Sequence, residues 1–400
     1  MTPLRVAVVL AAASGGTAAH AAMLARGCAD IGYEVRAFGP ESSRDFFSAP
    51  PAGGAQPGAR PPAGRPGTVV RFEPVRITSA SRPGANAAAL WRLRALLRSG
   101  GADVVHAHGV RAGAFAALAL ALLRRSAALV ITVHNAAPAG RLPALAYRVL
   151  ERVCARRADV VLCVSADLCA RMRRLRARRI AVAVVPAPPA RPPSAAAVAA
   201  ARAELGAGAR PVVLAVGRLA EQKGYRVLLS AAARWQRRQP RPLLVIAGTG
   251  PLAGELARSG REQGVDVRFL GQRADVAALL RAADVFVLAS SWEGQPLAVQ
   301  EALQAGTPVV ASRAGGVPEL TGPGAALLVP PGDPAALAAA VLAVLDDRQL
   351  AGALAAAAAA RGAQLPSVAD AVGAAAAVYL SLAAAARQRR TGIVRRKFRQ

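Results

Sequence analysis

Two glutamates, Glu293 and Glu301, stand with seven residues between them in the nearly uncharged segment EGQPLAVQEALQAGTPVV. If one helix ran through both, the step between them would advance about 12 Å and turn roughly 80° beyond two full turns. Carboxylates placed in that way cannot serve one bond as an acid/base pair. Because proline favours the first helical turn, we expect the helix to begin near Pro296. Glu293 then lies in the preceding loop, and Glu301 lies one to two turns inside the helix.

The start of this helix predicts an anion site. Free N–H groups and the positive end of the helix dipole attract a phosphate, so one extended phosphorylated ligand could use the helix start and both glutamates. The segment VGRLAEQKG, residues 216–224, supplies Arg218 and Lys223 after a predicted strand. These two cations could neutralise a diphosphate.

The elements that must position these residues alternate along the chain. Strand-like runs rich in Val and Leu are separated by helical stretches rich in Ala, Leu and Arg, which is a βαβ rhythm and predicts parallel sheets with helices on both faces. The expected strands of the first half are 4–10, 34–39, 69–75, 103–109 and 128–135, with helices near 17–31, 86–98 and 111–123. The Pro- and Gly-rich segment 49–67 is expected to be a flexible loop.

A second βα series follows PAPPARPP, residues 186–193, which is typical of a stiff linker. Its expected strands are 211–217, 242–248, 267–271, 285–290, 308–312 and 326–330. Ligands of doubly wound sheets bind at the carboxyl ends of the strands, here expected in a cleft between two domains. The domains are predicted to span 1–190 and 191–365, with a helix at 366–387 that crosses back to the first and a basic disordered tail at 388–400.

Composition agrees with two globular domains. The chain has 400 residues, of which 54% are hydrophobic and only 18% charged, too few charges for a disordered protein. The net charge is +28, and residues 141–179 alone carry 11 Arg against 3 acidic residues. This basic stretch fits either a solvated face or a role at a membrane surface or an anionic acceptor. Nucleic acid is not expected as a partner, because a single aromatic residue, Tyr147, interleaves with these arginines.

The four cysteines, Cys28, Cys154, Cys163 and Cys169, have neither CxxC spacing nor histidines at metal-ligand spacing. We therefore expect buried thiols in a reducing cytosol and no metal site. The first 16 residues are interpreted as a strand and a glycine turn rather than a signal peptide. The apolar run 112–123 is too short to span a bilayer. A cytoplasmic protein is expected, with peripheral contact to the inner membrane face left open.

The second domain closely resembles glycosyltransferase family 4, the retaining enzymes of the GT-B fold with an E-x7-E motif. The resemblance is carried by about 120 contiguous residues that include VVLAVGRLAEQKG, IAGTGP and the stretch from VRFLG to GGVPEL. The first domain is similar more loosely, through SGGTAAH, DVVHAHG and ITVHN. The implied fold is α/β, with two Rossmann-like doubly wound parallel-sheet domains facing a cleft. The N-terminal domain would bind the acceptor and the C-terminal domain the nucleotide sugar.

The resemblance also implies roles for residues. Arg218 and Lys223 would hold the diphosphate and stabilise it as it leaves, work that a metal does in the other large glycosyltransferase fold. Glu293 would lie against the sugar, and Glu301 would accept hydrogen bonds from the ribose. The remaining donor-binding positions are the glycines and backbone groups that the family motif places around the nucleotide sugar: Gly15, Gly16, Gly217, Gly248, Gly250, Gln272, Arg273, Gly294, Leu297 and Ala298.

All four histidines fall in the first third of the chain. His20 and His106 are expected to be structural. His134, in TVHN, matches the family position that contacts the donor sugar, and is counted with the catalytic residues. His108 stays open between a structural role and the acceptor site.

The implied reaction moves a hexose from a UDP- or GDP-sugar to an acceptor hydroxyl on a glycan or lipid, without a cofactor or metal. Retention is explained in this family without a protein nucleophile: the hydroxyl attacks from the leaving-group face, and the departing phosphate takes its proton. No Asp-x-Asp metal motif occurs in the chain. One departure stands at 186–190, where PAPPA replaces the Asn-Gly-Val-Asp-like turn common in the family.

Three other functions share parts of this pattern. IAGTGPLAGEL fits G-x-G-x-x-A through Gly248, Gly250 and Ala253, with Asp266 downstream, as in a nicotinamide-dependent oxidoreductase, but this leaves the two glutamates without a role. A glycoside hydrolase needs two carboxyl groups across the scissile bond, which the loop-and-helix placement disfavours. A non-catalytic sugar-nucleotide-binding protein would have the same donor site, so only turnover separates it.

Overall fold

The chain folds into two units. The computed structural model describes residues 3–11, 15–48, 70–78, 83–123, 127–136, 140–188 and 191–397. Unit 1 comprises Met1–Pro188 with Pro366–Gln400, and unit 2 comprises Pro189–Leu365. The expected flexible loop at 49–67 lies outside the described residues.

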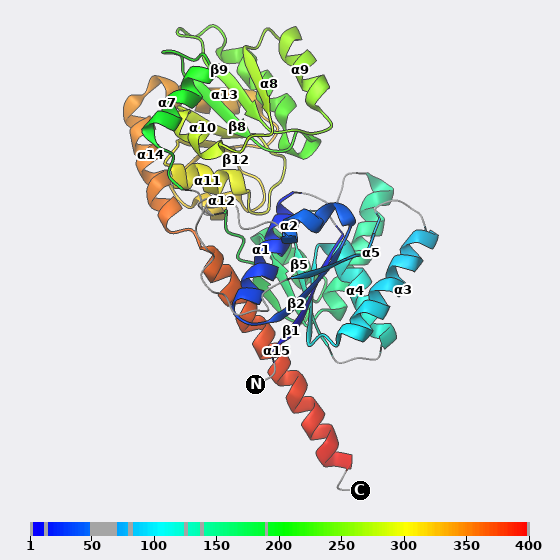
Figure 1. Ribbon diagram of the computed structural model, residues 1–400. Coiled ribbons are helices and arrows are strands. Elements are labelled where there is room, and N and C mark those ends of the chain that lie inside the picture. Colours follow the sequence, from blue (N-terminus) through cyan, green and yellow to red (C-terminus); the bar gives the residue numbers. More distant parts are fainter. Residues whose placement is uncertain are drawn as a thin grey trace. The chain divides into compact units, whose positions relative to one another are not determined.

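Unit 1 contains a seven-stranded parallel sheet in the order β3-β2-β1-β4-β5-β6-β7 (Figure 1). The chain runs outward from β1 to β3 and then returns to the other side of β1 at β4. The carboxyl ends of β1 and β4 therefore flank a topological switch point. The strands are β1 (Arg5–Leu10), β2 (Glu34–Gly39), β3 (Arg71–Pro74), β4 (Val104–His108), β5 (Ala128–Val133), β6 (Val160–Cys163) and β7 (Ile180–Val182). The α-helices are α1 (Gly16–Asp30), α2 (Arg44–Ser48), α3 (Pro83–Gly100), α4 (Val110–Leu123), α5 (Arg141–Arg157), α6 (Ala166–Arg174) and α15 (Val368–Lys397).

Unit 2 repeats this architecture with six parallel strands in the order β10-β9-β8-β11-β12-β13. Its switch point lies between β8 and β11. The strands are β8 (Val212–Val216), β9 (Leu243–Ala247), β10 (Val267–Gly271), β11 (Val285–Leu288), β12 (Val309–Ser312) and β13 (Leu327–Val329). The α-helices are α7 (Ala195–Glu204), α8 (Tyr225–Trp235), α9 (Ala253–Glu262), α10 (Val276–Ala282), α11 (Leu297–Ala305), α12 (Val317–Thr321), α13 (Pro334–Asp346) and α14 (Arg348–Ala363). The prediction of two Rossmann-like doubly wound sheets is confirmed.

The strand sequences explain why both sheets are parallel and covered on both faces. Every residue of β4, β5 and β9 is buried. The sequences ALVITV and LLVIA are almost continuously apolar, and the two histidines of VVHAH in β4 are buried as well. Strands with one wet face would alternate apolar and polar residues instead. Residues 141–179 stand out in the sequence only by their basic charge, and no helix or strand is predicted there. In the structure this segment contains α5, β6 and α6.

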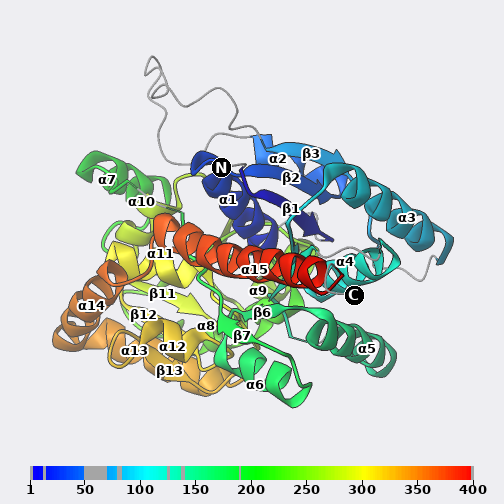
Figure 2. The same cartoon turned by 90° about the horizontal axis from the view of Figure 1, so that it is seen from below.

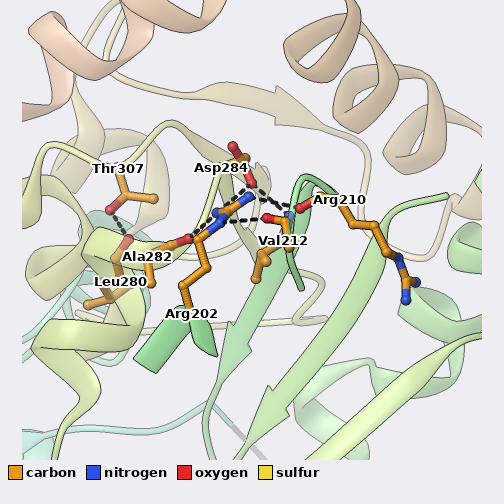
Figure 3. A network of polar contacts seen from close by, with 8 residues as sticks. Arg202, Arg210, Val212, Leu280, Ala282, Asp284 and Thr307 are labelled. Carbon is orange, nitrogen blue, oxygen red and sulfur yellow. Dashed lines mark hydrogen bonds and ion pairs between the residues drawn. The ribbon is translucent and has the colours of Figure 1, made fainter. Parts of the chain in front are cut away.

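A network of hydrogen bonds connects the elements at the amino edge of the unit 2 sheet (Figure 3). Asp284, just before β11, accepts hydrogen bonds from the backbone N–H of Val212, at the start of β8, at 2.7 Å and from Arg202 at 3.3 Å. Arg202, on α7, also donates to the carbonyls of Ala282 and Arg210, both at 2.8 Å. These contacts join the two strands that flank the switch point at the edge opposite their carboxyl ends.

Helix α15 belongs to unit 1, where it packs against α1, β4 and β5 (Figure 2). Its segment Val368–Ala385 is long and apolar enough to cross a membrane by length and composition. One face is nevertheless buried in the unit, and Tyr379 is only 1% exposed. The Tyr379 hydroxyl lies 2.5 Å from His106 Nδ1. We therefore interpret this stretch as a core helix.

The expected disordered tail at 388–400 is wrong over most of its length, because α15 continues to Lys397. The segment ARQRRTGIVRRK lacks proline and contains five arginines, a residue with high helix propensity. Positive charge alone does not prevent a helix that the preceding turns have already nucleated.

Tyr379→Phe tests the docking of α15. It would leave the ring nitrogen of His106 without its buried partner, so unit 1 should lose about 1–3 kcal/mol of stability. Thermal unfolding by calorimetry measures the loss. Leu380→Ala changes a neighbouring side chain that is 54% exposed and should stay within about 0.5 kcal/mol of wild type. Equal effects of the two changes would contradict the packing of this face.

Candidate functional site

The site residues predicted in the second domain gather at one edge of the unit 2 sheet. Parallel strands end at the same edge, so the residues that follow them become neighbours. Gly217 and Arg218 follow β8, Gly248 and Gly250 follow β9, Gln272 and Arg273 follow β10, Glu293 and Gly294 follow β11, and Leu297 and Ala298 begin α11.

An ion pair joins the two sides of the switch point. Lys223 Nζ lies 2.6 Å from Glu293 Oε1, and Ser290 Oγ donates to the same oxygen at 2.7 Å. Glu293 is only 5% exposed. A buried carboxylate without such partners would be strongly destabilising. Lys223 comes from the loop after β8 and Glu293 from the loop after β11, so the pair ties both loops together.

Arg218 differs from Lys223. It is exposed and makes no side-chain hydrogen bond or ion pair with the described residues. The sequence predicted the two cations as equal partners for a diphosphate. In the structure Arg218 has a free guanidinium, whereas the charge of Lys223 is already offset by Glu293.

The helix start is confirmed where Pro296 was expected to set it. Pro296 is the N-cap, and its carbonyl accepts hydrogen bonds from the N–H groups of Val299 and Gln300 at 3.2 and 3.3 Å. The N–H groups of Leu297 and Ala298 have no acceptor within the helix. They are therefore available to an anion at the carboxyl edge of the sheet.

Glu301 lies on the second turn of α11 and has no ion pair or side-chain hydrogen bond within the described part of the chain. Burial raises its pKa to about 7, from the usual 4.5. Glu293 and Glu301 therefore lie in opposite electrostatic environments. Glu293 is compensated by a cation, whereas Glu301 is desolvated and uncompensated.

Gly248 and Gly250 allow two loops to lie in contact. A Cβ on Gly248 would lie 1.9 Å from the carbonyl oxygen of Gly217, and one on Gly250 would lie 2.3 Å from that of Leu219. The loops are hydrogen-bonded, with Leu219 N–H donating to the carbonyl of Thr249 at 2.9 Å. This packing accounts for the G-x-G pattern without a dinucleotide.

The loop after β10 has its arginine side chain occupied. The Arg273 guanidinium binds Glu204 at 2.6 and 2.8 Å and Asp275 at 2.7 and 2.8 Å. Gln272 is exposed. Only the backbone of Arg273 could therefore contact a base, which is the role predicted for it.

Sequence reasoning missed three residues that build this edge. Ser290 supports Glu293, as described above. The Tyr225 hydroxyl donates to the Gly217 carbonyl at 3.0 Å. A Cβ on Gly315 would lie 1.9 Å from the carbonyl oxygen of Glu293. The two adjacent glycines in RAGGVPEL follow a predicted strand. They were the sequence feature that could have predicted the close contact of Gly315 with Glu293.

In unit 1 the four histidines form one buried group near the β1/β4 switch point. His106 and His108 lie on β4, His134 follows β5, and His20 lies on α1. His108 Nδ1 lies 3.1 Å from His134 Nε2, and His20 Nε2 lies 3.0 Å from the carbonyl oxygen of Val184.

Two predicted glycines and the histidine charges complete this edge. Gly15, with φ of 83°, caps α1, and Gly16 begins it; a Cβ on either would meet no atom within 4 Å. Burial lowers the pKa of His20 to about 4 and that of His106 to about 3. Burial, reinforced by the neighbouring histidines, also holds the pKa values of His108 and His134 well below 6.5. The group is therefore neutral at pH 7.

Comparison with known proteins shows which protein family this chain resembles. Residues 14–188 match the model described as Glycosyltransferase Family 4, and residues 210–347 match the model described as Glycosyl transferases group 1. D-inositol 3-phosphate glycosyltransferase of Corynebacterium kroppenstedtii is 40% identical over 159 residues, 36% of this chain and 35% of that protein. Glycogen synthase of Mycobacterium tuberculosis is 40% identical over 140 residues, 34% of each chain. The crystal structure of Anabaena HepE in complex with UDP and glucose has a TM-score of 0.77 at 21% identity, over 94% of this chain and 100% of that one.

The two doubly wound sheets and these structural neighbours define a GT-B protein. With one family match in each unit, the chain belongs to the family 4 glycosyltransferases. The matched stretches span about a third of the length of these two curated relatives.

Glu301→Gln tests the burial of the unpaired carboxyl. A folded-state pKa raised from 4.5 to about 7 gives stability that is present below pH 4.5 and lost as pH rises through 7. The glutamine variant cannot ionise, so it should match wild type near pH 4 and exceed it by about 1–3 kcal/mol at pH 8. Urea unfolding followed by the fluorescence of Trp235, buried in unit 2, measures the difference. A difference in stability between the two proteins that does not depend on pH would contradict the raised pKa of Glu301.

Proposed function

We propose that this protein is a retaining glycosyltransferase that moves a hexose from a UDP- or GDP-sugar to an acceptor hydroxyl, without a metal at the diphosphate. The observation that carries the proposal is the grouping at the carboxyl edge of unit 2. There, a free guanidinium on Arg218 and the open N–H groups of α11 accompany the Lys223–Glu293 pair.

Each group has a distinct task in the proposed reaction. Arg218 and the N–H groups of Leu297 and Ala298 receive the diphosphate, and their positive charge stabilises it as it leaves. Glu293 holds Lys223 in place beside the phosphates and presents its other oxygen to the sugar. The acceptor hydroxyl attacks on the leaving-group face, and the departing phosphate takes the proton, so no protein base is needed.

Glu301 is proposed to bind the ribose hydroxyls. Two hydroxyl donors would stabilise its carboxylate and draw the raised pKa back down. Donor binding should then release a proton near neutral pH. Proton release on donor binding would therefore test the contact between Glu301 and the ribose more specifically than a loss of affinity alone.

In unit 1 we propose that His134 contacts the donor sugar and that His108 lines the acceptor site. Gly15 and Gly16 would leave open backbone for donor or acceptor. The relatives named above are called after different acceptors, inositol phosphate and glycogen. Family membership therefore leaves the acceptor open.

Arg218→Ala should weaken binding of UDP-glucose or GDP-mannose about 10- to 100-fold, because one charged contact to phosphate is lost. Isothermal titration calorimetry measures this. Arg237→Ala removes an equally exposed arginine that lies between α8 and β9, at the opposite edge of the sheet, and should leave affinity unchanged. Equal losses would mean that overall charge, not a diphosphate site, drives binding. Binding of NADH alone would favour the oxidoreductase.

Affinity for the same sugar nucleotides should rise about 10-fold from pH 6 to pH 8 in wild type, because Glu301 must ionise to accept the ribose. Glu301→Gln should bind more weakly and show no such rise. A parallel pH profile in the two proteins would overturn the ribose assignment. Turnover with a panel of lipid-linked and soluble acceptors then separates an enzyme from a binding protein.

A membrane-peripheral location at the cytoplasmic face, with a lipid-linked or cell-envelope glycan acceptor, is proposed from α5. Its exposed apolar pair Leu145 and Val149, 58% and 54% exposed, is flanked by exposed Arg148, Arg152 and Arg156. An apolar pair inside a basic surface suits the interface of an anionic bilayer.

Leu145→Glu combined with Val149→Glu should abolish flotation with vesicles that contain anionic phospholipid, and higher salt should weaken wild-type binding. Ile31→Glu, at another exposed apolar position of unit 1, is the control and should float normally. Equally poor binding of wild type to anionic and neutral vesicles at low salt would sink the membrane proposal.

A further inference from the structure

The imidazoles of His20, His108 and His134 form a buried triad in unit 1, called here the three-histidine cluster. Each offers a ring nitrogen, and the three nitrogens lie within 4.8 Å of one another. We propose that this cluster binds one divalent transition-metal ion of the Zn²⁺ class.

The hydrogen bond of His20 determines its tautomer. A backbone carbonyl can only accept, so the contact with Val184 requires the proton on Nε2 and leaves the lone pair on Nδ1. Nδ1 is buried and has no hydrogen-bond partner. Metal-binding histidines typically donate their second ring N–H to a carbonyl or carboxylate in this way. His20 is therefore oriented as a ligand.

His108 and His134 share a single hydrogen bond through Nδ1 and Nε2. The other nitrogen of His108, Nε2, is also buried without a partner. A buried polar atom without a partner costs about 1–3 kcal/mol. The cluster thus carries two such nitrogens. Because a neutral imidazole has one N–H, coordination by all three rings would replace the His108–His134 hydrogen bond, and the ion would remove part of the cost of the unpaired nitrogens.

The separations suit coordination after a small adjustment. A tetrahedral ion about 2.1 Å from three ring nitrogens holds them about 3.4 Å apart. The cluster is already within 4.8 Å, and its ring centroids are 5.3 to 5.5 Å apart. Rotations about the side-chain bonds that move each ring by about 1 Å would close the site.

The donor set selects the kind of ion. Three imidazole nitrogens suit Zn²⁺, Co²⁺, Ni²⁺ or Cu²⁺, whereas Mg²⁺ and Ca²⁺ require oxygen ligands. Three protein ligands leave a fourth position for water or an anion.

His106 provides a control from inside the same group. Its Nδ1 lies 2.5 Å from the Tyr379 hydroxyl and its Nε2 lies 2.7 Å from Thr132 Oγ1. Both nitrogens are thus engaged, although the His106 ring centroid lies only 4.2 Å from that of His108. His106 should stay outside the coordination sphere.

Metal binding goes beyond the proposed function and does not rest on it. His134 is assigned to the donor sugar in that proposal, and a bound ion would occupy the same imidazole. The two proposals can fail separately, because metal binding is measured without nucleotide and nucleotide binding in unit 2 is measured with chelator present.

The test uses full-length, tag-free protein stripped with EDTA and titrated calorimetrically with ZnCl₂ or CoCl₂. One ion per chain should bind, and Co²⁺ should give the visible absorption of a tetrahedral nitrogen site. His20→Ala and His134→Ala should each weaken binding at least 10-fold, whereas His106→Gln should retain it. Thermal unfolding of each variant without metal checks the fold.

Absence of the tetrahedral Co²⁺ spectrum would overturn the proposal. So would unchanged binding in folded His20→Ala.

Discussion

The contact on which the candidate site depends is the buried ion pair between Lys223 and Glu293. Glu293 is nearly inaccessible to water, and a carboxylate so placed is tolerated only with a cation and further hydrogen-bond donors close by. Lys223 and Ser290 meet this requirement. The loops after β8 and β11 are thereby held together, and the exposed Arg218 and the start of α11 are displayed beside them.

The two glutamates of the opening motif illustrate how position decides chemistry. Pro296 ends the loop and starts the helix, so Glu293 and Glu301 lie in different local structures despite the short stretch between them. Glu293 is held by a charge partner, and Glu301 is held in a desolvated place without one, which raises its pKa to about 7. The first carboxylate suits a fixed structural role, and the second suits a partner that supplies its own hydrogen-bond donors.

The two units share an architecture but differ in the chemistry at their switch points. Unit 2 places cations and helix N–H groups at its carboxyl edge, which is a setting for a diphosphate. Unit 1 places neutral histidines at its own edge, supported by Tyr379 from the distant end of the chain. Fold alone therefore does not specify what each sheet binds, because the residues after the strands decide it.

The sequence by itself determined the alternation of strands and helices, the doubly wound class and the start of α11, because apolar periodicity and proline act over a few residues. It also predicted Arg218, Lys223 and the two glutamates as site residues, since the motifs that contain them are local. Only the tertiary structure decided that Lys223 is paired while Arg218 has no side-chain partner among the described residues, and that Gly248 serves loop packing. It alone brought four histidines from three elements into one buried group and docked α15 beside them. These contacts join residues dozens to hundreds of positions apart, and no local pattern encodes which distant groups share a buried space.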